Sequence, residues 1–381
     1  MPSRSTIVFV LSVLVALHAW IGWRLAPALS TNGAVQWICA LYLLLSVLLI
    51  PAGLLARNMR SQIWGDRLSW IGMLAMGMFS SLLLLTLVRE LVLLLVPLIC
   101  PTLQQLPRWS AQVAAWGALV LTLLGLINAR RVAAVVEVQV PIRGLPAELQ
   151  GFTIAQISDI HVGPTIKHDY LRAIVSKVND LHADLVAITG DLVDGSVAQL
   201  AQHTAPLADL RARHGVYFVT GNHEYYSDAL SWVVELRRLG VMVLMNEHVV
   251  LHHDGASLVL AGVTDYTAHH FDEAQRSDPQ AAMLHAPAES GVKILLAHQP
   301  RTASAAADAG FDLQLSGHTH GGQFFPWNLF VPLQQPYVAG LNKLRDLWIY
   351  TSRGTGYWGP PKRLLAPSEI TLLRLVAAPA A

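Results

Sequence analysis

Four long apolar segments in the first third of the chain constrain its fold most strongly. Of its 381 residues, 53% are hydrophobic and only 13% are charged. A helix needs roughly 20 apolar residues to cross a bilayer. Four segments come close to that length and leave almost no polar face for water, at residues 6–23, 35–55, 69–88 and 111–127. We therefore predict a membrane domain over residues 1–131 with about four transmembrane helices, followed by a soluble domain.

Two features leave alternatives open in this membrane domain. A second apolar run, residues 91–100, follows Arg89 and Glu90. As a helix it reaches only about 15 Å, which is too short to span a bilayer. We expect it to be interfacial or packed against the bundle; an extra crossing would invert the topology. The first segment also resembles a secretory signal that ends at Ala26-Pro27-Ala28, but the apolar segments after it favour a retained helix.

The basic residues near the ends of these segments predict the orientation. Most of them alternate onto one side of the membrane: Arg4, Arg57, Arg60, Arg67, Arg130 and Arg131. Only Arg24 and Arg108 fall on the other side. Because positively charged loops stay in the cytoplasm, both termini and the soluble domain are expected to face the cytoplasm, with membrane lipids around the helices.

The second half of the chain has the pattern of a layered α/β domain. Apolar runs typical of buried strands alternate with stretches of helical spacing at 170–181 and 229–239. The strand runs are residues 152–157, 185–189, 216–219, 258–263, 294–297, 313–315, 347–351 and 370–375. We place this domain at 150–376, with 132–149 as a linker or first strand. Its lack of cysteine excludes disulfides, and a net charge of +1 indicates no nucleic-acid partner.

Five short motifs each place a metal-ligating side chain just after one of the predicted strands. They are Asp159-Ile160-His161, Gly190-Asp191, Gly221-Asn222-His223-Glu224, His298-Gln299-Pro300 and Gly317-His318-Thr319-His320. Ligands collect outside the carboxyl ends of strands in such sheets, so we expect these side chains at one rim of one sheet. Two Asp, one Asn and several His without Cys form the ligand set of a two-metal hydrolytic site.

Each motif alone has an ordinary structural explanation. Asp and Asn after strands often cap helices or turns, and a single His is more often a surface or core residue than a ligand. The order and number of the motifs favour the metal site. Glu224 either orients a ligand or forms a surface ion pair, and Asp194 and Asp265 are expected in turns or behind the ligands.

These motifs resemble those of the calcineurin-like metallophosphoesterases, and the resemblance extends over about residues 138–375. The segment Ser316 to Gln323 is the most specific, and the chain is most similar to bacterial members with N-terminal membrane helices. The resemblance implies a sandwich of two mixed β-sheets flanked by helices. It also implies a multi-pass protein of the bacterial inner membrane.

The resemblance further implies a role for each site residue. A first metal would be held by Asp159, His161, Asp191 and His320. Asp191 would bridge to a second metal held by Asn222, His298 and His318. His223 would lie near the phosphate, neutralise its charge and protonate the leaving oxygen. Carboxylate, amide and imidazole ligands without thiolate favour two divalent ions, with Mn first and Fe or Zn as alternatives.

The reaction class is better defined than the substrate. We expect hydrolysis of a phosphoester or pyrophosphate bond, with a lipid-linked substrate at the membrane as the leading hypothesis and a UDP-2,3-diacylglucosamine-type pyrophosphate as a specific candidate. A soluble phosphodiester such as a cyclic nucleotide, a non-enzymatic membrane scaffold and a transporter are the alternatives. Residues 324–330 are either a buried packing segment or an apolar lip for acyl chains. Arg353, Lys362 and Arg363 are either phosphate ligands or solvated surface charges.

Overall fold

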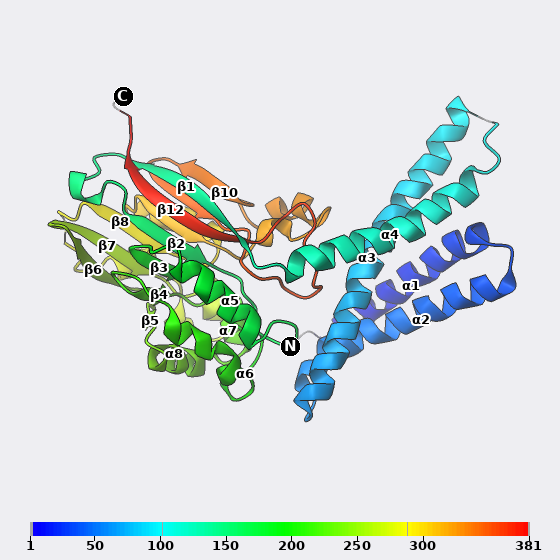
Figure 1. The fold of residues 1–381 in the computed structure, drawn as a ribbon, viewed down its shortest axis with the longest axis horizontal. Helices are drawn as coiled ribbons and strands as arrows, with labels where there is room; N and C mark the ends of the chain where they lie inside the picture. The colour runs from blue at the N-terminus through cyan, green and yellow to red at the C-terminus, as the bar shows by residue number, and fades with distance from the viewer. Residues whose placement is uncertain (1–2, 101, 288, 380–381) are drawn as a thin grey trace. The chain divides into compact units, whose positions relative to one another are not determined.

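The computed structural model describes residues 3–100, 102–287 and 289–379 (Figure 1). Within that part, the chain divides into two compact units. A helical unit comprises Met1–Ile127 with Gly359–Lys362, and an α/β unit comprises Asn128–Trp358 with Arg363–Ala381.

Among the described residues, four helices are long and apolar enough to cross a membrane. They are α1 (Arg4–Leu29), α2 (Gly33–Leu55), α3 (Gln62–Ile99) and α4 (Leu106–Arg130). Glycines let α2 and α3 pack closely: a Cβ added at Gly72 would lie 2.7 Å from the Cα of Gly53. Such contacts between small residues are typical of helix pairs in membranes.

Helix α3 differs from the sequence prediction. It is one continuous helix of 38 residues, about 57 Å long, and it includes the run at 91–100 that we expected to be a separate interfacial or packed segment. The charges that interrupt the apolar sequence are paired inside the helical unit. Glu90 lies 2.5 Å from Arg24 on α1 and 2.9 Å from Arg89. This pairing compensates the charges of Arg89 and Glu90 inside the apolar helix.

The described part of the α/β unit contains two mixed six-stranded sheets. The first has the order β1 (Ala134–Ile142), β12 (Glu369–Ala377), β2 (Thr153–Ile157), β3 (Leu185–Ile188), β4 (Val216–Phe218) and β5 (Met242–Val243). The second has the order β10 (Gly340–Leu344), β11 (Leu347–Thr351), β9 (Leu313–Ser316), β8 (Val292–Leu296), β7 (Ala256–Gly262) and β6 (Glu247–His253). Of the strands that lead to the site, β2, β3 and β4 run parallel to one another in the first sheet, and β8 and β9 run parallel to each other in the second.

Side chains along each strand alternate between the core that separates the two sheets and the helices outside them. On β3, Leu185 and Ala187 face the core between the two sheets, whereas Val186 and Ile188 face the helices. Successive side chains of a strand point to opposite faces, so a strand buried on both sides is apolar throughout. The helices of the unit are α5 (His168–Asn179), α6 (Val197–Thr204), α7 (Asn222–Tyr226), α8 (Ala229–Arg238), α9 (Pro279–Ala282) and α10 (Ala303–Asp308).

The helices cover both outer faces of this sandwich. Residues of α5, α6 and α8, such as Ile174, Leu200 and Trp232, pack on the first sheet. Ala303 and Ala306 of α10 pack on the second. The predicted two-sheet sandwich flanked by helices is therefore confirmed, as are the predicted helices that become α5 and α8. Residues 134–142 form a strand, β1, rather than a linker.

Candidate metal centre

The predicted ligands come from two sheets, and our expectation of one rim of one sheet is wrong. Asp159, Asp191 and Asn222 follow β2, β3 and β4 of the first sheet. His298, His318 and His320 follow β8 and β9 of the second sheet. The two sheets pack face to face through the core between them, and the carboxyl ends of both sets of parallel strands meet: His298 contacts the Thr189 carbonyl, and the His318 N–H donates to Asp159. The site therefore lies across the sandwich.

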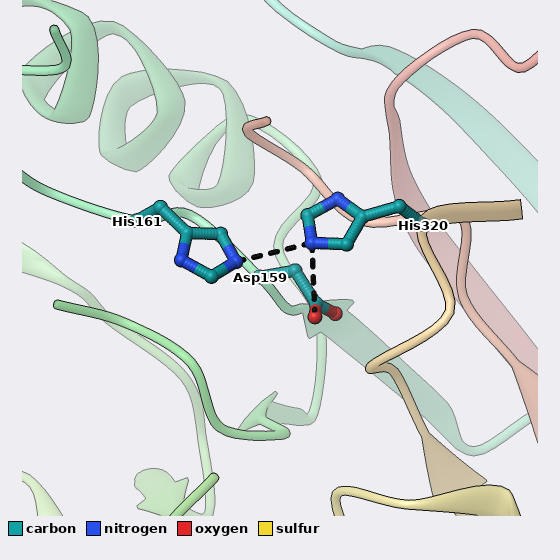
Figure 2. A group of neighbouring side chains, drawn as sticks. All are labelled: Asp159, His161 and His320. Carbon is teal, nitrogen blue, oxygen red and sulfur yellow. Dashed lines mark hydrogen bonds and ion pairs between the residues drawn. The ribbon is translucent and has the colours of Figure 1, made fainter. Parts of the chain in front are cut away.

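One group of ligand atoms combines both sheets. Candidate ligand atoms of Asp159, His161 and His320, all buried, lie within 4.8 Å of one another. The Nε2 atoms of His161 and His320 are 3.0 Å apart, and His320 Nε2 is 3.5 Å from Asp159 Oδ1. Figure 2 shows the two imidazole rings and the carboxylate turned toward a common point.

A second group lies on the other side of Asp191. Candidate ligand atoms of Asp191, His298 and His318 also lie within 4.8 Å of one another. His298 Nδ1 donates to the Thr189 carbonyl over 2.8 Å, which leaves Nε2, 3.1 Å from Asp191 Oδ2, as the ligating nitrogen. His161 Nε2 is 3.9 Å from the same Asp191 oxygen. Asp191 therefore lies between the two groups, as expected for a bridging ligand.

Asp194 supports two histidines of the site. Its Oδ1 accepts from His161 Nδ1 at 3.1 Å and from His223 Nδ1 at 2.5 Å. Of the two roles that we expected for Asp194, the one behind the ligands is what the structure contains. A carboxylate on Nδ1 fixes the tautomer, so Nε2 of His161 points at the candidate metal position. The spacing Asp191-Leu192-Val193-Asp194 is the only sequence signal for this role.

Glu224 accepts hydrogen bonds from the backbone N–H groups around Asp191. It is fully buried, and its two oxygens accept from the N–H groups of Gly221, Asp191, Leu192 and Val193 at 2.6 to 3.3 Å. A surface ion pair is therefore excluded, and Glu224 acts by ordering the loops that carry Asp191 and Asn222. Asp265 is also fully buried, and it accepts from Thr267 and Gln299.

The backbone at the site is strained. Non-glycine residues rarely adopt positive φ, and such residues cluster where the surrounding structure enforces them. Five predicted ligands do so, with φ between 50° and 71°: Asp159, His161, Asp191, His318 and His320. Glycine also permits close approach, since a Cβ at Gly190 would lie 2.7 Å from His298 Nδ1.

The neighbouring charges shift the pKa values of this cluster. Burial lowers the pKa of His223, but the carboxylates of Asp191 and Asp194 outweigh burial and raise that pKa to about 9. Burial raises the pKa of Asp194, but His161 and His223 outweigh it and lower that pKa well below its usual range. Burial lowers the pKa of His318 to about 3, which keeps this imidazole neutral. A neutral imidazole is the form that binds a metal ion.

Three basic residues near the C-terminus differ from expectation. Lys362 and Arg363 are buried, so they are not solvated surface charges. Arg363 donates to the carbonyls of Arg353, Gly356 and His320, and it faces His320 Nδ1 at 3.0 Å. Arg353 pairs with the buried Glu369 at 2.6 Å. Arg363 therefore supports the candidate ligand His320, a role that the sequence alone does not indicate.

The residues present fit divalent metal ions. Asn222 Oδ1 is buried without a hydrogen-bond partner among the described residues, as is expected of an oxygen that ligates an ion. Imidazole nitrogens, carboxylates and this amide form two adjoining groups without thiolate. Such a donor set suits divalent first-row metals.

Next to this site, residues 324–333 are mostly exposed. Phe324 is buried, so the packing alternative holds for that residue alone. The apolar lip, as we call the large hydrophobic residues of the segment that are exposed, consists of Phe325, Trp327, Leu329, Phe330 and Leu333. It begins five residues after His320 and includes two short 3₁₀ helices, Trp327–Leu329 and Val331–Leu333.

The two-sheet sandwich and the clustered ligands at its strand ends place the chain in the class of metallophosphoesterase domains. The sequence profile of the calcineurin-like phosphoesterases matches residues 152–322. An uncharacterized metallophosphoesterase of Aquifex aeolicus is 33% identical over 224 residues, 58% of this chain and 84% of that protein. The chain belongs to the calcineurin-like metallophosphoesterase family.

Two further relatives are longer than the matched segment. A bovine "Transmembrane protein with metallophosphoesterase domain" is 42% identical over 270 residues, 68% of this chain and 61% of that protein. An uncharacterized metallophosphoesterase of Helicobacter pylori is 42% identical over 226 residues, 58% of this chain and 59% of that protein. The match thus spans about three fifths of each of these relatives.

Proposed function

We propose that this protein hydrolyses phosphoester or pyrophosphate bonds with two divalent metal ions. Asp159, His161, Asp191 and His320 would hold the first ion. Asp191, Asn222, His298 and His318 would hold the second. The observation that carries the proposal is the meeting of two buried ligand groups on either side of Asp191, in a chain of this family. Manganese is the favoured metal, with iron or zinc as alternatives.

His223 is the proposed catalytic residue beside Asp191. Its Nδ1 is held by Asp194, so Nε2, 3.9 Å from Asp191 Oδ2, is the nitrogen left for a substrate. A protonated imidazole at this point neutralises phosphate charge and gives its proton to the leaving oxygen. When bound, the metal ions would supply positive charge that polarises the phosphoryl group and activates water. Asp191 orients His223 further by accepting from the His223 backbone N–H at 2.9 Å.

A lipid-linked substrate at the membrane surface is the favoured class. The apolar lip supports this choice, because its side chains are exposed, up to 81% at Leu333, and the segment follows the candidate ligand His320. Helix α4 ends at Arg130 and β1 begins at Ala134, so a short linker tethers the domain to the last candidate span. A UDP-2,3-diacylglucosamine-type pyrophosphate is a specific candidate. A soluble cyclic nucleotide and a scaffold role are the alternatives.

The proposed location is the bacterial inner membrane, with several helices spanning it and the α/β domain in the cytoplasm. The basic residues on one side of the candidate spans support this orientation. A reporter fused after Ala381 tests it: a periplasmic signal would overturn the cytoplasmic assignment.

The activity is tested with the full-length protein in detergent, bis(p-nitrophenyl) phosphate as substrate and added Mn²⁺. We expect turnover that is lost on chelation and restored by Mn²⁺, and that is abolished in Asp191→Ala and His223→Ala. Metal analysis separates the two roles: Asp191→Ala should lose bound metal, whereas His223→Ala should retain it. Asp169→Ala, at an exposed position on α5, is the matched control. A metal-loaded protein without turnover on any phosphoester would support the scaffold alternative.

A further inference from the structure

Two aromatic rings from separate segments contact the imidazole of His223. The ring of Tyr226, at the end of α7, lies 5.3 Å from it between centroids, at an interplanar angle of 69°. The ring of Trp358, on the loop after β11, lies 5.7 Å away at 76°. Both are edge-to-face contacts, a geometry favoured between aromatic rings. His223 thus contacts the rings of Tyr226 and Trp358 in addition to the His161 ring and the carboxylates that orient it.

Both rings also face solvent. Tyr226 is 56% exposed and Trp358 is 51% exposed, although the side chain of His223 is only 14% exposed. Phe271, itself exposed, extends the aromatic surface, because its ring lies 5.7 Å from that of Tyr226. Packing in a core explains none of these positions. Exposed aromatic rings beside a reactive group are available to contact a ligand.

The backbone of Trp358 is fixed. Its N–H donates to Gln323 Oε1 and its carbonyl accepts from Gln323 Nε2, both at 2.8 Å. Gln323 closes the loop that carries His320, so the indole is tied to the candidate metal centre. Tyr226 is tied to the site in the same way, because α7 begins with Asn222 and His223. The two rings are therefore built into the segments that carry the proposed ligands.

The side chains of Tyr226 and Trp358 carry no charge, so the position that the leaving group would occupy gains no charge from them. The basic residues within five positions of Trp358 have other partners. Lys362 donates to the Gly77 carbonyl and to the Ser81 hydroxyl, the Arg363 guanidinium contacts carbonyls and His320, and Arg353 pairs with Glu369. A second phosphate would find no cation on Tyr226 or Trp358. A flat, uncharged ring would stack on either of them.

We propose that Tyr226 and Trp358 form a specificity subsite for a leaving group that carries an aromatic ring, next to His223. The inference rests on the proposed hydrolase function and names a substrate class for it. In the reaction, the P–O bond to the leaving group breaks and a water oxygen bonds to phosphorus. The leaving oxygen takes a proton from His223 Nε2, and the proton lost by water restores His223. The two rings bind the group that departs and take no part in the proton transfer.

The test measures binding and turnover separately in the full-length, Mn²⁺-loaded protein. Calorimetry compares phenylphosphonate with methylphosphonate, which share the phosphonate and differ in the ring. We expect the phenyl compound to bind roughly tenfold more tightly, the scale of one good aromatic contact. Tyr226→Ala and Trp358→Ala should each lose most of that preference and leave methylphosphonate binding unchanged. Tyr226→Phe should retain the preference, as should Trp358→Phe in large part, and Val234→Ala, at an exposed apolar position on α8, is the control.

Kinetic measurements then distinguish a role of Tyr226 and Trp358 in substrate specificity from a role in positioning His223. With bis(p-nitrophenyl) phosphate, loss of a specificity ring raises KM and leaves kcat near its original value. If both alanine variants lower kcat and keep the phenyl preference, the rings only position His223 and the proposal is overturned. If the phenyl preference is absent from the original protein although turnover is present, the subsite fails and the hydrolase function stands. If the preference is present and responds to the variants but turnover is absent, the hydrolase function fails and the subsite stands as a binding site.

Discussion

The Asp194 carboxylate accepts a hydrogen bond from His223 Nδ1 over 2.5 Å, and the same oxygen accepts from His161 Nδ1. One side chain therefore orients a proposed metal ligand and the proposed proton donor. We predict that Asp194→Asn lowers kcat of phosphodiester hydrolysis by about 10- to 100-fold, the range found for residues that support metal ligands. The exposed Asp169→Asn is the control. Equal kcat in both variants would contradict the role of Asp194.

Glu224 gives a prediction on stability. Both of its oxygens accept from backbone N–H groups. Glu224→Gln replaces one acceptor by an NH₂ donor that faces N–H groups in a buried site. We expect the free energy of unfolding to fall by about 1–3 kcal/mol, the cost of unsatisfied buried polar groups. Thermal unfolding measures the change, with Glu235→Gln, which removes an ion pair with Arg238, as a milder comparison. No loss beyond that of Glu235→Gln would refute the prediction.

Gly221 gives a steric prediction. A Cβ at this position would overlap Asp191 Oδ1, and its φ is not positive, so the effect of alanine is purely one of space. We expect Gly221→Ala to displace Asp191 and to lower metal content and kcat/KM together, by at least about 100-fold for a misplacement near 1 Å. Gly33→Ala is the control, since a Cβ there meets no atom within 4 Å. Full metal content in Gly221→Ala would show that the loop adapts.

His214 gives a prediction on pH dependence away from the metal centre. Burial lowers the pKa of His214 below 6.5; His253 and Arg213 lower it further, and Asp184 and Asp254 oppose them. The unfolded chain then binds the proton more readily than the folded one. The stabilisation is therefore fully present above about pH 6.5, begins to be lost as the pH falls below that value, and is gone once the pH is below the lower pKa of the folded state. Melting temperatures between about pH 8 and pH 5 should fall more steeply for the original protein than for His214→Gln. Parallel curves for the two proteins would exclude His214 as a source of the pH dependence of stability.

Much of the fold follows from local pattern. The run 185–188 is apolar throughout because both faces of β3 are buried, and this pattern can be recognised in the sequence alone. The edge strand β5 has only two residues and gives no pattern to detect. The length of α3 was missed because Arg89 and Glu90 read as a break. Glu90 pairs with Arg89 and also with Arg24, which is 66 residues away in sequence, so this second pairing is visible only in three dimensions.

The candidate site, too, can be predicted from the sequence only in part. Metal-ligating residue types after strands mark the candidate ligands, and the structure brings them together around Asp191. Which sheet each strand joins is a matter of long-range pairing, so the meeting of two sheets at the site was not predicted. The roles of Asp194, Glu224 and Arg363 likewise depend on contacts between distant segments. Asp194, for example, reaches His161 across 33 positions of sequence.

The positive φ angles at Asp159, His161, Asp191, His318 and His320 have a consequence for the evolution of this domain. Each such angle costs an L-residue on the order of 1 kcal/mol that glycine would not incur. Glycine would relieve this strain, but it would also remove the candidate ligand and, at Asp191 and Asp159, the acceptors of the His223 and His318 N–H groups. These five positions therefore carry backbone strain together with a side chain that the chemistry needs, and a relative that has lost its activity should have exchanged some of these side chains.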